Sequence, residues 1–196
     1  MARPRTHDEA LRTRLLDRAG ELLSTEGAKA LSLRKLATDV GTSTTAVYSL
    51  FGSKPDLVNA LYAEGFQRFG ARMEAVGHTD DPVEDFVRLG LAYRDSALAD
   101  PHLYSIMFTK AVPGFEPSAE ATELSQGTLA PLVETVRRAI ETGRFRDTDP
   151  KAIAVSAWGI VHGLVSLELS GNLPLNLDVT GSYEAALRAH ARGWCR

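Results

Sequence analysis

Apolar residues recur every three or four positions along almost the whole chain, and this spacing predicts amphipathic helices. The first such pattern includes Leu11 and Leu15. It begins at Thr6, which can form a capping box with Glu9, and stops at Gly27. No segment of alternating apolar and polar residues is longer than a few positions, so we expect no β-sheet. The pattern predicts an all-α protein of about nine helices.

Helix start and stop signals divide the remainder of the chain. Ser32 and Gly41 delimit a short second helix, and Thr42 or Ser43 can cap a third that runs to Phe51. A second capping box, with the sequence Ser-Lys-Pro-Asp, opens a long fourth helix at residue 53. Three Asp-Pro pairs each place a carboxylate before a proline that suits the first helical position. Further helices are expected at residues 82–98, 101–109, 119–142 (interrupted by a glycine at 127 and a proline at 131), 150–170 and 179–194, with loops at 111–114 and 172–178.

Residues 31–51 have the order helix, glycine turn, helix, which is typical of a helix-turn-helix. The apolar side chains that can pack between the two helices are Leu33, Leu36, Ala37, Val40, Val47, Leu50 and Phe51. The side chains left on the outer face of the second helix are Thr44, Thr45, Tyr48 and Ser49. A small, hydroxyl-bearing face fits a major groove about 12 Å wide and offers donors to bases and phosphates. A purely structural hairpin is the alternative, but its exposed face usually carries long charged side chains, and none occurs between Asp39 and Lys54.

Composition and charge agree with a nucleic-acid-binding head. The chain has 196 residues, of which 44% are hydrophobic and 24% charged, so it can bury a core and is not expected to be disordered. Residues 1–54 contain nine Lys or Arg and six acidic residues, a net charge of +3, whereas the whole chain carries −3. A basic first segment followed by a more acidic remainder is typical of a DNA-binding head attached to a separate body.

Residues 8–73 resemble the DNA-binding domain of the TetR family of bacterial transcription regulators. The positions that match the family pattern are Leu36, Ala37, Gly41, Ser43, Val47, Tyr48, Phe51, Ser53 and Lys54. The resemblance implies a helix-turn-helix DNA-binding domain at residues 1–53, a linking helix at 54–76, and a helical body for effector binding and dimerisation at 77–196. Ser49 and Leu50 depart from the pattern, because many members have an aromatic residue and a histidine at these positions.

The resemblance also implies roles for individual residues on double-stranded DNA. The implied DNA-binding residues are Arg34, Ser43, Thr44, Thr45, Ala46, Tyr48, Ser49 and Lys54. Tyr48 would contact a phosphate or a thymine, Lys54 would hold a phosphate, and Arg34 would reach a guanine or the backbone. Arg3 and Arg5 either reach DNA as an arm or form a frayed terminus.

The helix expected at residues 150–170 is apolar on nearly all sides. Such a helix must be buried on both sides, which is difficult within 196 residues, so one face is expected to pack against a second chain. The resemblance extends to Trp158, His162 and Gly163, a Trp-x-x-x-His-Gly motif of one subgroup, and implies a homodimer through helices 150–170 and 179–194. The last helix is expected to contribute Tyr183, Ala186, Leu187 and His190 to this interface. Such a dimer places two recognition helices about 34 Å apart and requires a palindromic operator.

Aromatic and polar-tipped side chains could line a cavity for a small-molecule effector. The candidates are Tyr62, Phe66, Tyr93, Tyr104, Met107, Phe108, Trp158 and His162. Ordinary core packing is the alternative for each of them. The hypothesis is a repressor that a small, largely apolar effector releases from its operator by stabilising a second conformation. An activator of the same fold is an alternative that the sequence does not separate from a repressor.

No sequence feature indicates catalysis, a cofactor or a metal site. The five histidines are scattered, and the chain lacks a His-Glu-x-x-His motif, a glycine-rich phosphate loop and a nucleophile elbow. The single cysteine, Cys195, excludes an internal disulfide and a cysteine-based zinc site. The uncharged run at 152–167 is shorter than the roughly 20 residues of a membrane span, and the charged N-terminus lacks a secretory signal, so we expect a cytoplasmic protein without a membrane partner. A helical adaptor that binds only proteins is the remaining alternative.

Overall fold

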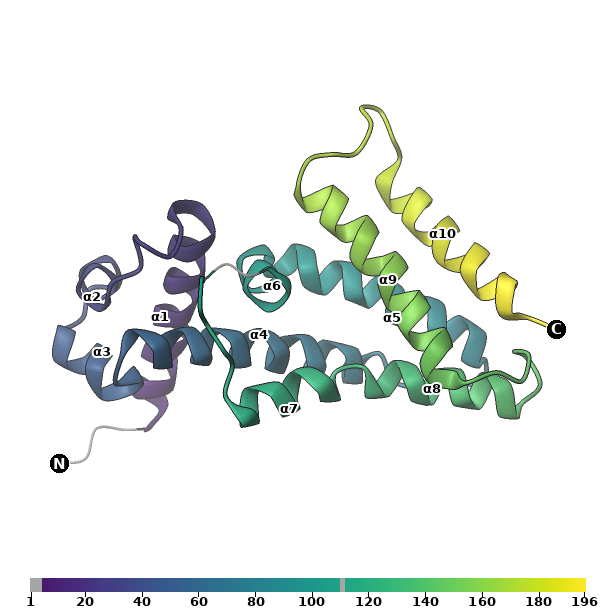
Figure 1. Ribbon diagram of the computed structural model, residues 1–196, viewed down its shortest axis with the longest axis horizontal. Coiled ribbons are helices and arrows are strands. Elements are labelled where there is room, and N and C mark those ends of the chain that lie inside the picture. Colours follow the sequence, from purple (N-terminus) through teal and green to yellow (C-terminus); the bar gives the residue numbers. More distant parts are fainter. Residues whose placement is uncertain (1–4, 110–111) are drawn as a thin grey trace. The chain divides into compact units, whose positions relative to one another are not determined.

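A computed structural model describes residues 5–109 and 112–196, with side chains from residue 8 onward in the first stretch. Its helices are α1 (Arg5–Glu26), α2 (Leu33–Val40), α3 (Thr44–Phe51), α4 (Lys54–Ala75), α5 (Pro82–Ala99), α6 (Pro101–Phe108), α7 (Ala119–Gly127), α8 (Ala130–Glu141), α9 (Pro150–Leu169) and α10 (Val179–Trp194) (Figure 1). The prediction of an all-α protein is confirmed. In the described residues, the β-type pairing consists of one isolated antiparallel bridge between Phe145 and Cys195. The helix expected at 119–142 is divided into α7 and α8 at the predicted interruption.

Helix starts follow the local signals in the sequence. α5, α6 and α9 each begin at the proline of an Asp-Pro pair, as predicted. Asp81 and Asp149 cap α5 and α9, because their carboxylates accept hydrogen bonds from the amides of Val83 and Lys151, both at 3.0 Å. Asp100 precedes α6 in the same way, but its side chain makes no cap hydrogen bond. The fixed φ of proline therefore suffices to start α6 without a carboxylate cap.

The chain divides into two compact units. The first comprises the described residues within Met1–Gln67 and Asp100–Ser125, and the second comprises Arg68–Ala99 and Gln126–Arg196. α6 belongs to the first unit because it packs against α1. The predicted functional boundaries at 1–53, 54–76 and 77–196 stay a prediction.

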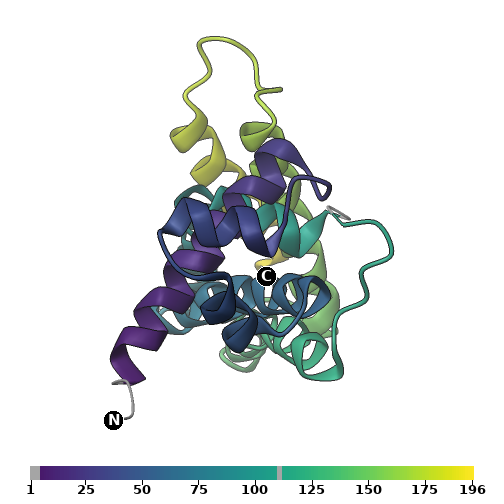
Figure 2. The ribbon, with the colours of Figure 1, turned by 90° about the vertical axis from the view of Figure 1, so that its left-hand side faces the viewer.

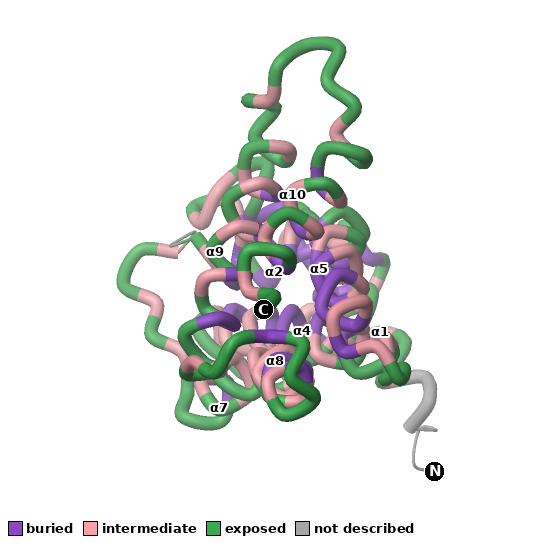
Figure 3. The backbone as a smooth tube through the Cα atoms, turned by 90° about the vertical axis from the view of Figure 1, so that its right-hand side faces the viewer, coloured by how far each residue is buried: buried purple, intermediate pink, exposed green. Residues whose placement is uncertain are grey.

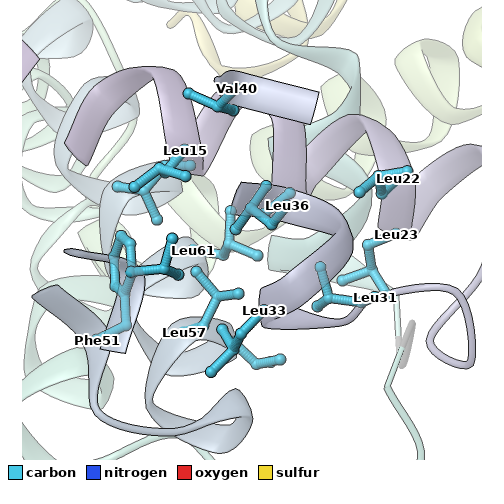
Figure 4. Packing of buried hydrophobic residues seen from close by; sticks show 14 of the residues in the cluster. Leu15, Leu22, Leu23, Leu31, Leu33, Leu36, Val40, Phe51, Leu57 and Leu61 are labelled. Atoms are coloured by element: carbon cyan, nitrogen blue, oxygen red, sulfur yellow. The ribbon is translucent and has the colours of Figure 1, made fainter. Parts of the chain in front are cut away.

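An apolar core holds the helices of the first unit together (Figure 4). Leu15 of α1, Leu36 of α2 and Leu57 of α4 are completely buried in it. α6 contributes Leu103 and Ile106, which are also buried. The short helices α2 and α3, blue in Figure 2, are thus fixed to the longer α1 and α4 by side chains that water does not reach.

α5 is the central helix of the second unit, and α8, α9 and α10 pack against it. Its Asp85 is fully buried and accepts hydrogen bonds from the Thr79 amide at 2.9 Å and from the Arg138 guanidinium at 3.1 Å. Burial alone would raise the pKa of Asp85, but the hydrogen bonds from Thr79 and Arg138 outweigh this and lower the pKa. This ionised carboxylate ties the start of α5 to α8 and to the preceding loop. Figure 3 shows buried residues gathered along α5.

Some expectations concern parts of the chain that the structure does not describe. These are Arg3, the side chains of Arg5 and Thr6, and the first residue of the loop predicted at 111–114.

By length and composition alone, α9 is apolar enough to cross a membrane, which is also typical of a core helix in a globular protein. The expectation of no membrane partner therefore stays a prediction.

Candidate nucleic-acid interface

α2 and α3 form a helix-turn-helix whose ends are fixed by local hydrogen bonds. Ser32 caps α2 by accepting from the amide of Lys35 at 3.1 Å, and Ser43 caps α3 by accepting from the amide of Ala46 at 3.1 Å. Gly41 lies between the two helices with φ +73°, a left-handed conformation that a side chain would strain. The predicted caps and glycine turn are confirmed.

The two sides of α3 differ sharply in exposure. Val47 and Phe51 are buried against α2 and the first-unit core. Tyr48 is 52% exposed, and Thr45 and Ser49 are exposed beside it. The partly exposed residues at the start of the helix are Thr44 and Ala46. The division that the sequence predicted is confirmed, and we call Thr44, Thr45, Tyr48 and Ser49 the outer face of α3.

Two basic residues that are expected to contact DNA, Arg34 and Lys54, differ in their surroundings. Arg34, in the first turn of α2, is exposed. The Lys54 ammonium, at the start of α4, donates a hydrogen bond to the Ala28 carbonyl at 2.6 Å and is partly buried. A lysine ammonium has three N–H donors, so this bond leaves two for other acceptors. No pattern in the sequence indicates the bond from Lys54 to Ala28, which lies in the loop between α1 and α2. The phosphate role of Lys54 stays a prediction.

Other basic side chains of the head are engaged within the first unit. Arg14 donates to the Val40 carbonyl at 2.6 Å, and Arg18 pairs with Asp39 at 2.8 Å. Lys35 pairs with an acidic residue of α1, Glu26, at 2.6 Å. These bonds attach α2 to α1. Arg14, Arg18 and Lys35, which are among the nine basic residues counted at residues 1–54, therefore help to hold α2 in position.

The residues expected to line an effector cavity form two groups, one in each unit. The group in the first unit consists of Tyr62, Phe66, Tyr104, Met107 and Phe108. Ring centroids are 4.9 Å apart for Tyr62 and Phe66, 5.7 Å for Phe66 and Phe108, and 4.9 Å for Tyr104 and Phe108. This distance range is typical of aromatic packing in a core.

The second group combines polar tips with aromatic rings. Tyr93 Oη lies 3.2 Å from Nδ1 of His162, and the rings of His162 and Trp158 are 6.1 Å apart. Burial lowers the pKa of His162, so the neutral imidazole is favoured at pH 7. The predicted effector role of both groups stays a prediction.

α9 has a buried face and an open face. The buried side chains are Ile153, Ala154, Ala157, Val161 and Val165. Val155 and Leu167 on the open face are 51% and 44% exposed, and Trp158 is 37% exposed. We call Val155, Trp158, Gly159, Gly163 and Leu167 the open face of α9.

The expectation that Tyr183 and Leu187 contact a second chain is wrong. Both are almost completely buried within the second unit. Tyr183 Oη donates to the Gly90 carbonyl at 3.0 Å, and Leu187 fills the space above Gly90 of α5. The apolar face of α10 is therefore used inside the subunit, because the missing side chain at Gly90 lets α10 approach α5 closely.

The other two residues expected at that interface are partly buried. Ala186 and His190 have intermediate exposure. Nε2 of His190 accepts a hydrogen bond from Trp194 Nε1 at 3.2 Å and lies 3.3 Å from Ser156 Oγ. The contact with Ser156 joins α10 to α9, whereas the bond from Trp194 lies within α10. In the part of the chain that the structure describes, no group of three or more His, Cys, Asp or Glu could hold a metal ion.

The sequence matches two family models, one in its N-terminal part and one in its C-terminal part. Residues 15–61 match bacterial regulatory proteins of the tetR family, and residues 86–190 match the tetracyclin repressor-like C-terminal domain. The HTH-type transcriptional regulator Rv1816 of Mycobacterium tuberculosis is 23% identical over 150 residues, which are 74% of this chain and 63% of the relative. The match thus spans less than two thirds of the length of this curated relative.

Solved structures have the same fold over nearly the whole chain. A protein of unknown function from Rhodococcus sp. RHA1 has a TM-score of 0.81 and 30% identity, with 95% of this chain and 96% of that chain covered. The TetR family transcriptional regulator PfmR from Thermus thermophilus has a TM-score of 0.71 and 22% identity, with 93% and 100% covered, and shares the fold. Since the C-terminal model alone matches more than half of the residues, the chain belongs to the TetR family of bacterial regulatory proteins.

Proposed function

We propose that this protein is a sequence-specific, DNA-binding regulator of transcription in the cytoplasm, and that α3 enters the major groove of its operator. The observation that carries the proposal is the outer face of α3. Tyr48 is 52% exposed there, whereas Val47 and Phe51 fix the opposite side in the core. A firmly attached helix with a small hydroxyl-bearing face has the properties that a recognition helix needs.

The N-terminus of α3 holds a backbone phosphate. The Ser43 hydroxyl already accepts from the amide of Ala46, which leaves its own proton for a phosphate oxygen. Thr44 supplies a second hydroxyl at the positive end of the helix dipole. Thr45 and Ala46 then face the bases, and Ser49 lies one turn further along the same face.

The flanking residues supply charge and position. Tyr48 contacts a phosphate or the methyl group of a thymine. Arg34 makes a bidentate contact to guanine or pairs with the backbone. The two N–H groups of Lys54 that Ala28 does not use reach a phosphate, so the same side chain fixes the α1–α2 loop and contacts DNA.

The regulator acts as a homodimer through the open face of α9 and the exposed part of α10. Support comes from Val155 and Leu167, two large apolar side chains about half exposed on that face. Gly159 and Gly163 lie between them, and nothing occupies the space where their Cβ atoms would stand. A partner helix can therefore approach the backbone closely. Two-fold symmetry then places the recognition helices about 34 Å apart on a palindromic operator.

A small, largely apolar effector regulates DNA binding. Support comes from the Tyr93–His162 pair, which presents polar atoms beside the Trp158 ring. Binding sites for small molecules commonly combine apolar walls with a few such polar groups. The effector releases the operator by stabilising a conformation that binds DNA less well, so it must bind that conformation more tightly. The protein acts by binding and not by catalysis.

Selection of bound sequences from a random DNA pool, followed by anisotropy titration, tests the proposal. Tyr48→Ala and Lys54→Ala should weaken binding to all sequences, whereas Arg34→Ala should relax the preference at one base pair by about 1–3 kcal/mol. Thr25→Ala is the matched control, because Thr25 is an exposed hydroxyl of α1 that bonds to the Glu21 carbonyl at 2.7 Å. It should leave binding unchanged.

Two results would contradict the proposal. One is the absence of any enriched sequence at low salt, which would favour the protein-binding adaptor. The other is unaltered affinity when Tyr48 and Thr45 are both replaced by alanine. A reporter gene with the selected operator at its promoter then separates repression from activation, and a screen for release identifies the effector.

A further inference from the structure

The loop between α9 and α10, residues 171–178, exposes apolar side chains. Leu175 is 93% exposed and Leu177 is 41% exposed. Leu167 and Leu169, in the last turn of α9, are 44% and 37% exposed. One exposed leucine is ordinary on a soluble protein, but four within eleven residues are an unusual concentration of exposed apolar side chains. Figure 3 shows this loop exposed over most of its length.

Hydrogen bonds fix the start of this loop. Gly171 has φ +67° and ends α9. Its amide donates to the Glu168 carbonyl at 3.0 Å, and the amide of Asn172 donates to the Leu167 carbonyl at 3.0 Å. This pair of bonds is the glycine cap that commonly closes a helix, and it sets the direction in which the loop leaves α9.

The tip and the end of the loop are also ordered by local bonds. The amide of Leu177 donates to the Pro174 carbonyl at 3.4 Å, and Asn176 between them has φ +68°. Asp178 caps α10 by accepting from the amide of Gly181 at 3.0 Å. A loop held by local hydrogen bonds loses little conformational freedom on binding, so little free energy is lost when its exposed leucines contact a partner.

We propose that Leu175 and Leu177 pack against a second copy of this chain and extend the dimer interface beyond the two helices. This inference rests on the proposed homodimer. The loop joins the two helices that form that interface. Leu167 belongs to the open face of α9, and Leu169 lies in the same last turn, directly before the loop. In a two-fold dimer each such contact occurs twice.

The charge of the segment favours a protein partner over a lipid surface. Residues 166–178 contain Glu168 and Asp178 and no lysine or arginine. Loops and helices that bind anionic membranes combine apolar residues with basic ones. A second copy offers the same apolar surface and requires no added positive charge.

Sedimentation equilibrium of the full chain tests the inference with Leu175→Asp. Leu175 is 93% exposed, so this substitution leaves the fold of the subunit intact, which circular dichroism can verify. Burial of one leucine favours association by roughly ten- to a hundredfold, and each dimer buries two copies. We expect the dimer dissociation constant to rise at least about a hundredfold. Leu98→Asp is the matched control, because Leu98 is a 38% exposed leucine of α5 in the same unit, and it should change the constant less than about threefold.

The possible results are distinguishable. If the parent is dimeric and Leu175→Asp dimerises equally well, the inference is overturned while the homodimer stands. If the parent is monomeric at all concentrations, the homodimer fails and this inference fails with it. If vesicles of phosphatidylcholine and phosphatidylglycerol bind the parent but not the variant, and dimerisation is unchanged, the loop contacts lipid and the inference is overturned.

Discussion

A substitution at Gly90 tests how α10 is held within the second unit. A Cβ atom added at Gly90 would lie 2.5 Å from Cδ2 and 2.8 Å from Cδ1 of Leu187, well inside the carbon–carbon contact distance of about 3.5–4.0 Å. Leu187 is 1% exposed, so its side chain is enclosed by the core and cannot turn out into solvent. Gly90→Ala should therefore push α10 away from α5 and stretch the hydrogen bond from Tyr183 to the Gly90 carbonyl.

The magnitude follows from opposing effects. Helix propensity favours alanine over glycine by about 1 kcal/mol. Overpacking a core typically costs about 1–3 kcal/mol, and the strained Tyr183 hydrogen bond costs about 0.5–1.5 kcal/mol more. The two losses exceed the gain, so we expect the free energy of unfolding to fall by about 2 kcal/mol.

Urea unfolding followed by circular dichroism measures this change, with all variants at one protein concentration because dimerisation contributes to stability. Gly70→Ala is the matched control, because its Cβ would lie 3.7 Å from Thr128 Cγ2, an ordinary contact. It should raise the free energy of unfolding by about 0.5–1 kcal/mol.

The double variant Gly90→Ala/Leu187→Ala identifies the cause. Leu187→Ala alone should cost about 2–5 kcal/mol, as for other buried leucines. With the leucine removed, the added methyl at Gly90 has room, so its effect should turn neutral or stabilising. If Gly90→Ala stabilises the parent as much as Gly70→Ala does, the steric argument is wrong.

Three further outcomes are expected. Burial lowers the pKa of His190, so its contribution to the free energy of unfolding is complete above about pH 6.5 and is lost as the pH falls toward the lower pKa of the folded state. His190→Gln, which still accepts from Trp194, should weaken the dependence of the free energy of unfolding on pH between roughly pH 5 and 7. An unchanged dependence would exclude His190 as its cause. Arg94 and Glu168 form two hydrogen bonds of 2.8 and 2.6 Å and are largely buried. Arg94→Met should therefore lower the free energy of unfolding, measured in urea titrations, by roughly 1.5–3 kcal/mol. A loss below about 0.5 kcal/mol would mean that water replaces the pair. Lys54→Met should reduce the slope of log affinity against log salt by about 1, whereas an unchanged slope would show that Lys54 acts through the loop carbonyl alone.

Local features of the fold were predictable from the sequence because neighbouring residues determine them. Ser32, Ser43 and Asp149 cap the helices at which they were predicted, since an N-cap bond joins residues only two or three positions apart. The two faces of α3 follow from helical periodicity in the same way. These signals sufficed to place the recognition helix and its exposed hydroxyl groups.

Contacts between distant residues were not predictable. Gly90 and Leu187 are 97 positions apart, and no pattern in either helix reveals that one fits over the other. The same holds for the bond from Lys54 to the Ala28 carbonyl. Periodicity showed that α10 has an apolar face but not which surface covers it, and for this reason Tyr183 was wrongly assigned to a second chain.

The division of α3 into two faces has a consequence for how regulators with this head diversify. Val47 and Phe51 attach the helix, while Thr45 and Ser49 contribute little to the core. Exchanges of exposed residues usually change stability by less than about 0.5 kcal/mol. After a gene duplication, one copy could therefore acquire a new target sequence through a few substitutions without passing through an unfolded intermediate.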